Sequence, residues 1–158
     1  MSQPEEIFEE LGFNRRDVRQ PEGAIVYALG RTYNLVMRRF NACYKKFGLS
    51  PASFNLLMLL ERGRAAMTQR ELGERLVVSP SDMTGLVDRL ERKGLVRRTP
   101  GQDRRAKILQ ITPRGSALVE KVWPHHAEEM RRVVRVFSTN EANVLARGLT
   151  QLRQTCSG

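Results

Sequence analysis

Residues 68–112 read TQRELGERLVVSPSDMTGLVDRLERKGLVRRTPGQDRRAKILQIT, and cap residues mark the helix boundaries within them. Thr68 is followed three residues later by Glu71. This is the spacing of a capping box, in which the two side chains bond backbone N–H groups that the first helical turn leaves free. The pattern predicts a helix over residues 68–76.

A second helix is expected to begin shortly after the first one ends. Ser79 is its cap, and Pro80 takes the first helical position, where a missing N–H costs nothing. Gly94 ends the helix, because glycine enters the left-handed conformation without a Cβ clash. Only a tight turn fits between the helices, so the sequence predicts a helix-turn-helix with its second helix over residues 80–93.

The second helix has an apolar and a polar face. Four apolar residues at helical spacing are expected to pack inward: Met83, Leu86, Val87 and Leu90. The outer face holds Ser81, Thr84, Gly85, Asp88 and Arg89. Short hydroxyl side chains near the start of such a helix suit entry into a major groove, where they can bond base edges. Any solvent-exposed helix can also carry Ser and Thr, so this face alone does not identify a DNA-binding helix.

A basic hairpin follows the two helices. Residues 95–99 and 106–112 are short β-like runs, and Pro100-Gly101 marks a loop between them. Five arginines lie in the hairpin and at the start of the next helix: Arg97, Arg98, Arg104, Arg105 and Arg114. A helix-turn-helix followed by a basic β-hairpin is typical of a winged helix.

These segments also carry a family resemblance. Asp103-Arg104-Arg105 and then Ile111-Thr112-Pro113-Arg114-Gly115 resemble the wing signature of the MarR family of bacterial regulators, with Ile111 in place of the usual Leu. Residues 86–96, LVDRLERKGLV, are similar to the family's recognition-helix segment. The resemblance covers about residues 21–155, and the motifs are specific in combination although each is short.

The expected fold class is mostly α with a small β-hairpin wing, and it contains about six helices. A winged helix-turn-helix DNA-binding lobe spans about residues 50–112. Helices over about residues 21–47 and 113–155 form a dimerisation lobe, as the resemblance implies. Residues 1–20 are an N-terminal arm that is either a short amphipathic helix or a disordered tail.

The charge distribution agrees with a DNA-binding lobe. The chain has 158 residues, a net charge of +10 and a pI near 10.6, which points towards a polyanionic partner. Residues 62–107 hold twelve Arg or Lys and six Asp or Glu, a net charge of +6, against +1 for residues 1–61 and +3 for residues 108–158. An arginine-rich composition alone does not explain this clustering.

The remaining helices are predicted from periodicity and caps. Apolar residues recur every three or four positions between Pro21 and Phe47, and a shorter helix is expected to begin at Ser50-Pro51. After the wing, Pro124 is expected to kink or split a helix that starts at Thr112-Pro113. Ser138 and Glu141 form another capping box, which opens a last helix with Leu145, Leu149 and Leu152 on one stripe.

The first and last helices have more apolar surface than one winged lobe can cover. A homodimer resolves the excess, because a two-fold interface buries the same patch on both subunits. The resemblance implies the same arrangement, with two winged lobes facing one pseudo-palindromic operator in double-stranded DNA. We therefore expect a sequence-specific transcriptional regulator that acts as a repressor.

The expected DNA contacts divide by their place on the duplex. Arg105, which resembles the family's wing-tip arginine, is expected in a minor groove, with Asp103 holding its guanidinium in place. Ser81, Thr84 and Arg89 are expected to meet major-groove base edges, while Arg97, Arg104 and the start of the Thr68 helix hold phosphates. The full set of expected DNA-binding residues is Thr68, Gln69, Arg70, Ser79, Ser81, Thr84, Asp88, Arg89, Arg97, Arg104 and Arg105.

The resemblance also implies an effector. Regulators of this family commonly release DNA when small aromatic or phenolic anions enter a pocket between the two lobes. In this chain Tyr33, Arg38, Phe54 and Met58 would line that pocket, although each is also compatible with an ordinary core or surface position.

An enzyme is not expected. His125 and His126 are adjacent on a helix and point in different directions, and no nucleophile triad or phosphate-binding loop stands out. We expect no cofactor and no metal site. Cys43 and Cys156 are too far apart for a zinc motif, but Cys43 offers the alternative of a redox sensor, which its place in an apolar stripe disfavours.

Two further alternatives remain open. An architectural DNA-binding protein without an effector would show the same basic charge, whereas a winged helix used only for protein contacts would not need the wing arginines. The sequence has no signal-peptide pattern and no apolar run long enough for a membrane span, so a cytoplasmic protein is expected.

Overall fold

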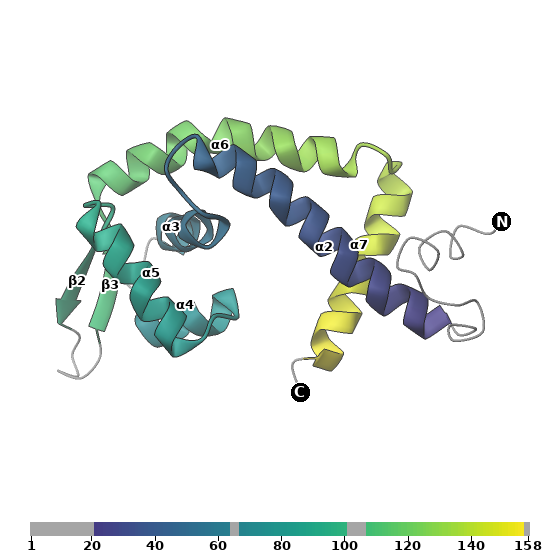
Figure 1. The fold of residues 1–158 in the computed structure, drawn as a ribbon, viewed down its shortest axis with the longest axis horizontal. Coiled ribbons are helices and arrows are strands. Elements are labelled where there is room, and N and C mark those ends of the chain that lie inside the picture. The colour runs from purple at the N-terminus through teal and green to yellow at the C-terminus, as the bar shows by residue number, and fades with distance from the viewer. Residues whose placement is uncertain (1–20, 64–66, 101–106, 157–158) are drawn as a thin grey trace. The chain divides into compact units, whose positions relative to one another are not determined.

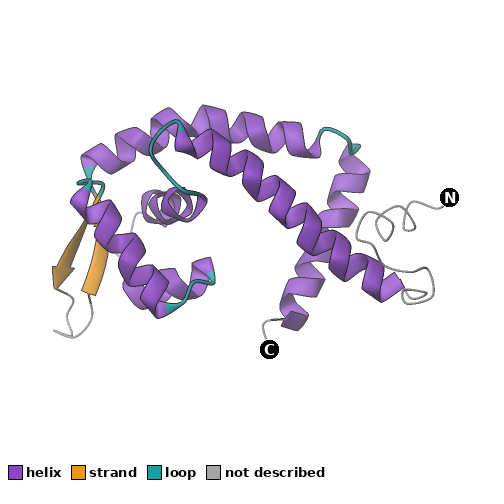
Figure 2. Ribbon diagram, in the orientation of Figure 1, coloured by secondary structure: helices purple, strands orange, loops and turns teal. Residues whose placement is uncertain are grey.

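The computed structural model describes residues 21–63, 67–100 and 107–156, and most of these residues are helical (Figures 1 and 2). Six helices and three strands lie among them. In chain order they are α2 (Pro21–Lys45), α3 (Pro51–Gly63), β1 (Met67–Thr68), α4 (Gln69–Leu76), α5 (Pro80–Arg92), β2 (Val96–Pro100), β3 (Lys107–Ile111), α6 (Pro113–Val134) and α7 (Thr139–Cys156). The predicted fold class, a mostly α winged helix-turn-helix, is confirmed.

The chain divides into two units, residues 1–42 and residues 43–158. In the second unit α3 packs against α4, α5, α6 and β3, and Figure 1 shows it end-on among the other helices of that unit. Its side chains form the centre of the core. Residues with no exposed surface include Phe54, Leu56 and Leu57 of α3, Leu72 of α4, Val87 of α5, Leu109 of β3 and Val122 of α6.

The capped helix starts lie where the sequence predicts them. The Thr68 N–H donates to Glu71 Oε2 over 2.7 Å, and the Glu71 N–H donates to Thr68 Oγ1 over 3.2 Å. Ser79 caps α5 by accepting from the Asp82 N–H over 3.2 Å. Gly94 follows α5 with φ +65°, as expected for the glycine that ends the helix.

The sheet has one strand more than the sequence predicts. Its order is β1-β3-β2, with both neighbouring pairs antiparallel. β2 and β3 are the predicted wing strands, and Val96 lies opposite Ile111. β1 has only two residues, so no periodicity marks it in the sequence, yet it joins the start of α4 to the wing.

The start of α6 is pressed against the base of the wing. The Gly115 N–H donates to Thr112 Oγ1 over 3.1 Å, and the Thr112 hydroxyl donates to the Gly94 carbonyl oxygen over 2.7 Å. A Cβ atom at Gly115 would lie 2.2 Å from the Leu95 carbonyl oxygen. The glycine of the wing signature is therefore required for this close approach.

Pro124 is predicted to kink or split this helix, and the split is wrong, because α6 runs from Pro113 to Val134 without interruption. A proline removes one main-chain hydrogen bond and crowds the carbonyl four residues earlier, a local loss that a long helix can absorb. Packing of the buried Val119 and Val122 holds the part of α6 that precedes Pro124.

Exposed apolar side chains lie on α2, α6 and α7. No residue of α7 is buried, and Val144, Leu145 and Leu149 are each between 42% and 53% exposed. On α2, Ile25, Leu29 and Tyr33 are between 42% and 62% exposed.

Candidate DNA-binding surface

The first helix of the helix-turn-helix is fixed at its start by the capping box. Hydrogen bonds from the Thr68 backbone and side chain lower the pKa of Glu71, so its carboxylate stays charged as the partner of Thr68. Gln69 and Arg70 form the first turn of α4. The Arg70 side chain is 88% exposed and pairs with Glu74 over 2.9 Å.

The turn between the helices uses a strained residue. Val77 has φ 53° and ψ 50°, a left-handed conformation that costs a β-branched residue on the order of 1–3 kcal/mol. The turn is closed by the Val78 N–H, which donates to the Gly73 carbonyl oxygen over 3.1 Å. Val77 itself is 92% exposed, so the strain is not offset by burial of its own side chain. The turn fixes the direction in which α5 leaves α4.

The exposed face of α5 is the one predicted to meet DNA. Met83, Leu86, Val87 and Leu90 are buried, as expected. The residues predicted for the opposite face are exposed or half-buried. Ser81, Thr84 and Arg89 are exposed, and Gly85 and Asp88 are half-buried; the cap residue Ser79 is also exposed.

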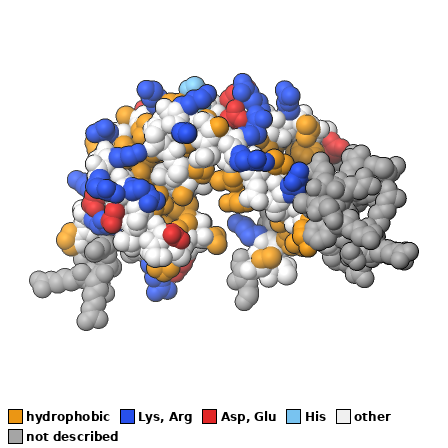
Figure 3. All heavy atoms as spheres, viewed as in Figure 1, with side chains coloured by type: hydrophobic (Ala, Val, Ile, Leu, Met, Phe, Trp, Pro, Cys, Tyr) orange, Lys and Arg blue, Asp and Glu red, His pale blue; other side chains and the backbone are white. Residues whose placement is uncertain are grey.

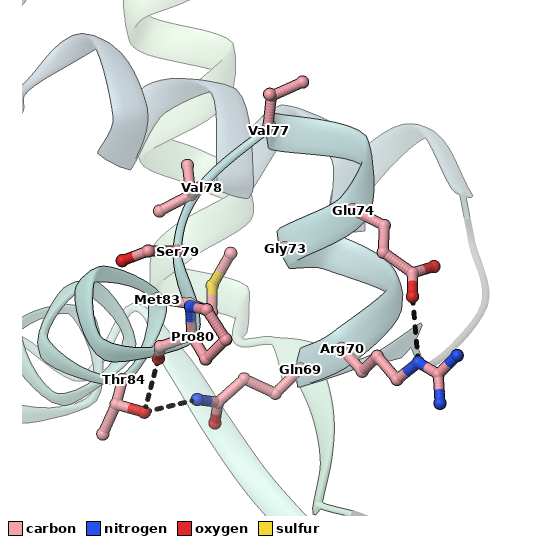
Figure 4. Close-up of a pocket in the computed structure, with 10 residues that line it drawn as sticks. All are labelled: Gln69, Arg70, Gly73, Glu74, Val77, Val78, Ser79, Pro80, Met83 and Thr84. Atoms are coloured by element: carbon pink, nitrogen blue, oxygen red, sulfur yellow. Dashed lines mark hydrogen bonds and ion pairs between the residues drawn. The ribbon is translucent and has the colours of Figure 1, made fainter. Parts of the chain in front are cut away.

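A groove of about 850 Å³ lies where α4 and α5 meet, and Figure 4 shows the residues around it. The Gln69 side chain reaches across from α4, and its Nε2 donates to Thr84 Oγ1 over 2.9 Å. Thr84 Oγ1 in turn donates to the Pro80 carbonyl oxygen over 3.0 Å. Two predicted DNA contacts from different helices are thus bonded to each other.

The wing is joined to α5 by an arginine whose role the sequence does not show. Arg98 of β2 bonds Glu91 over 2.6 Å and Asp88 over 2.5 Å, and its side chain is only 20% exposed. Burial alone would lower the pKa of Arg98, but the two carboxylates raise it. Asp88, predicted to contact DNA, is therefore bound to the wing. The sequence gives one hint of this contact: Asp88 and Glu91 are one helical turn apart on α5, so both carboxylates can face the same arginine.

The other wing residues differ in what the structure describes. Arg97 is exposed, and its Nε donates to Gln110 Oε1 over 3.0 Å, which orients it on the outer side of the hairpin. Asp103, Arg104 and Arg105 lie outside the described residues, so their expected roles stay predictions.

Basic side chains gather over α5 and the start of α6 in Figure 3. The residues of those segments that supply the charge include Arg92, Lys93, Arg114 and Lys121, all exposed. Lys93 is tied to the loop before α3 by a bond of 2.6 Å to the Gly48 carbonyl oxygen.

The four residues expected to bind an effector occupy different environments. Phe54 has no exposed surface and stacks on Tyr44 with ring centres 4.7 Å apart, so it is a core residue. Met58 of α3 is half-buried, and Tyr33 and Arg38 of α2 are exposed. Binding of an effector by these residues stays a prediction.

A cluster of aromatic rings surrounds His126, a residue that the sequence offers only as a disfavoured catalytic candidate. The Tyr44 hydroxyl lies 2.6 Å from His126 Nδ1, and the Phe54 and Trp123 rings lie 5.1 and 5.3 Å from the His126 ring. Burial, with a smaller effect of Arg62, lowers the pKa of His126. The lowered pKa favours the neutral imidazole, which shares a hydrogen bond with the Tyr44 hydroxyl.

No metal site emerges in the described part of the chain, and the thiol of Cys43 lacks the environment of a redox sensor. No group of three His, Cys, Asp or Glu side chains within residues 21–63, 67–100 and 107–156 is arranged to hold a metal ion. Burial and the charge of Glu129 raise the pKa of Cys43, which reduces the thiolate that redox sensing requires. No helix in the described segments is long and apolar enough to cross a membrane.

Comparison with known proteins gives three kinds of similarity. The sequence model of the MarR family matches residues 47–106. The HTH-type transcriptional regulator MhqR of Bacillus subtilis is 31% identical over 117 residues, which cover 73% of this chain and 80% of MhqR. The structure of the S. aureus MepR–DNA complex is similar with a TM-score of 0.77 at 22% identity, over 82% of this chain and 96% of MepR.

A further solved structure is similar at the level of the fold. BpsR of Bordetella bronchiseptica, whose DNA binding is regulated by 6-hydroxynicotinic acid, matches with a TM-score of 0.75 at 22% identity, over 82% of this chain and 98% of BpsR.

Proposed function

The chain belongs to the MarR family of DNA-binding transcriptional regulators, and from this we propose that it is a homodimeric repressor of one pseudo-palindromic operator, released by a small aromatic anion. The observation that supports sequence-specific binding is the exposed face of α5. Its hydroxyl side chains and Arg89 stand on a helix held by a cap at its start and by Arg98 at the wing. Such a rigid helix suits base contacts in a major groove.

Selection from a randomised duplex library tests the DNA-binding part. We expect a two-fold symmetric consensus, and titrations should then give an affinity for it about a thousandfold or more above that for random DNA. The same affinity for both would instead indicate an architectural protein. No binding to either would indicate a winged helix used for protein contacts.

The sign of regulation needs a separate test. The selected operator is placed across a promoter that drives a reporter gene, and the protein is expressed from a second promoter. Lower reporter expression with the wild-type protein, and not with a variant that has lost DNA binding, supports a repressor. Higher expression would make the protein an activator.

The effector is proposed from the family and from the regulation of BpsR by 6-hydroxynicotinic acid. A thermal-shift screen of aromatic and phenolic acids identifies binders, and each binder is then added to the protein–operator complex. We expect at least one binder to release the DNA. Arg38→Ala should weaken this release, because it removes a cation that would pair with the carboxylate of the aromatic acid. If every binder leaves the protein–operator complex intact, regulation by an effector is no longer part of the proposal.

A further inference from the structure

We propose that Gln69 recognises an adenine base in the operator and that Thr84 holds the Gln69 amide in position for this contact. The inference rests on the proposed function, because it names the residues that set one base preference of the proposed operator. It moves Gln69 from the phosphate contacts expected at the start of α4 to direct recognition of a base.

The geometry of the pair fixes which atoms are available. Thr84 Oγ1 lies 3.0 Å from the Pro80 carbonyl oxygen and 2.9 Å from Gln69 Nε2, as the dashed lines in Figure 4 show. A hydroxyl has one hydrogen, and here it is donated to Pro80. Thr84 can therefore only accept from Gln69. The amide nitrogen must face Thr84, because the reverse orientation would place two acceptors against each other.

Counting hydrogen-bond donors and acceptors also shows which groups of Gln69 remain available to bind DNA. One hydrogen of its amide nitrogen is bonded to Thr84, so the second hydrogen and the carbonyl oxygen remain for a ligand. One donor beside one acceptor matches the major-groove edge of adenine, which presents the N7 acceptor and the N6 amino donor. Guanine presents two acceptors there, so the Gln69 carbonyl oxygen would meet guanine O6. Cytosine and thymine offer no such donor–acceptor pair.

The position of the pair favours a base over a phosphate. Thr84 draws the Gln69 amide across to the exposed face of α5, the helix that the family places in the major groove. Among the residues that line the groove around the pair, Arg70 is the one cation, and it is bonded to Glu74 over 2.9 Å. Among these lining residues, a phosphate would therefore meet a single cation, which is already paired with a carboxylate.

The first experiment selects operators with the wild-type protein and with three variants. We expect adenine at one position of each half-site for the wild type, and loss of that preference for Gln69→Ala. Thr84→Val keeps the shape of the side chain but removes the hydroxyl, and is expected to lose the same preference. Thr84→Ser keeps the hydroxyl and is expected to retain it. Both sites are at the surface, and circular dichroism verifies that each variant is folded.

The second experiment separates a base contact from a backbone contact. Replacing that adenine by guanine is expected to weaken wild-type binding about 5- to 150-fold. Replacing it by 7-deazaadenine, which lacks only the N7 acceptor, is expected to weaken wild-type binding about fivefold. Gln69→Ala should be insensitive to both replacements. The double variant Gln69→Ala/Thr84→Val should distinguish adenine from guanine as well as Gln69→Ala alone does, because the two residues act as one unit.

The outcomes distinguish this inference from the proposed function. If the wild type selects no consensus, the proposed function fails. If the wild type selects a consensus and Gln69→Ala selects the same bases, only the role of Gln69 fails. Sensitivity of the wild type to a neutral methylphosphonate linkage, but not to 7-deazaadenine, would assign Gln69 to a phosphate and overturn the inference.

Discussion

Arg98 shows how a single side chain can join two elements that the sequence presents separately. It stands in a run of wing arginines that all suggest DNA contact, yet its guanidinium bonds Asp88 and Glu91 on α5. The pairing depends on how the hairpin folds back over α5, which no local pattern encodes. The spacing of Asp88 and Glu91 shows only that their side chains share a face.

Replacement of Arg98 is expected to affect both stability and DNA binding. Arg98→Met removes bonds to two partly buried carboxylates, which should lower the free energy of unfolding by about 1–3 kcal/mol. The wing would also lose its tie to α5, so operator affinity should fall by more than stability alone predicts. Urea unfolding and operator titration measure the two effects. Arg70→Ala, which breaks a fully exposed pair with Glu74, is the stability control and should change the free energy of unfolding far less, because water screens that pair. Equal losses for the two variants would contradict the role of Arg98.

His126 is expected to make stability depend on pH. Burial lowers its pKa in the folded protein below the ordinary value of 6.5, so the unfolded chain binds the proton more readily. The stabilisation is therefore complete above about pH 6.5 and is lost as the pH falls through that value towards the lower folded pKa.

Urea unfolding between about pH 7.5 and about pH 5.5 measures this dependence. His126→Gln cannot titrate but keeps a side chain that can hydrogen-bond to Tyr44, and it should flatten the curve in this range. His125→Gln, the same substitution at the exposed neighbouring position, is the matched control. A wild-type curve that is already flat would exclude the linkage.

Elements whose boundaries are set by local chemistry could be predicted, and those set by tertiary packing could not. The Thr68 and Ser79 caps bond backbone groups within the same turn, so their helices begin where the sequence indicates. β1 exists only because two residues pair with β3, and α6 passes Pro124 although proline disfavours a helix interior. The candidate site divides in the same way. The exposed face of α5 follows from periodicity, whereas the Gln69–Thr84 bond requires two helices in place.

Gly115 gives a test of packing between elements. Gly115→Ala would bring a Cβ to 2.2 Å from the Leu95 carbonyl oxygen and 2.7 Å from Ile111 Cγ1, so α6 would have to move away from the wing. We expect a loss of about 1–3 kcal/mol in the free energy of unfolding and weaker operator binding. Gly148→Ala on α7, where an added Cβ would meet no atom of the chain beyond its own helical turn, should instead stabilise the protein by about 0.5–1 kcal/mol. Thermal and urea unfolding compare the two, and destabilisation of similar size by both would contradict the packing argument.

At the scale of the whole molecule, the exposed apolar face of α7 is the feature that a single chain leaves unexplained. A helix of this length is marginal in water without tertiary packing, yet no α7 residue is buried. Leu145 and Leu149 lie on one stripe, one helical turn apart, and a second copy of the chain is the partner that the proposed homodimer supplies.

The last prediction follows from that stripe. Light scattering at micromolar concentration should give the wild type twice the chain mass of 18.1 kDa. Leu145→Lys/Leu149→Lys places two charges in the proposed interface, and should yield monomers that bind a single half-site but lose the affinity gained from two linked half-sites. Gln154→Lys adds a charge on the side of α7 opposite Leu145, and should remain dimeric with wild-type operator affinity. A double variant that stays dimeric, or a wild type that is monomeric, would show that α7 packs on something other than a second copy.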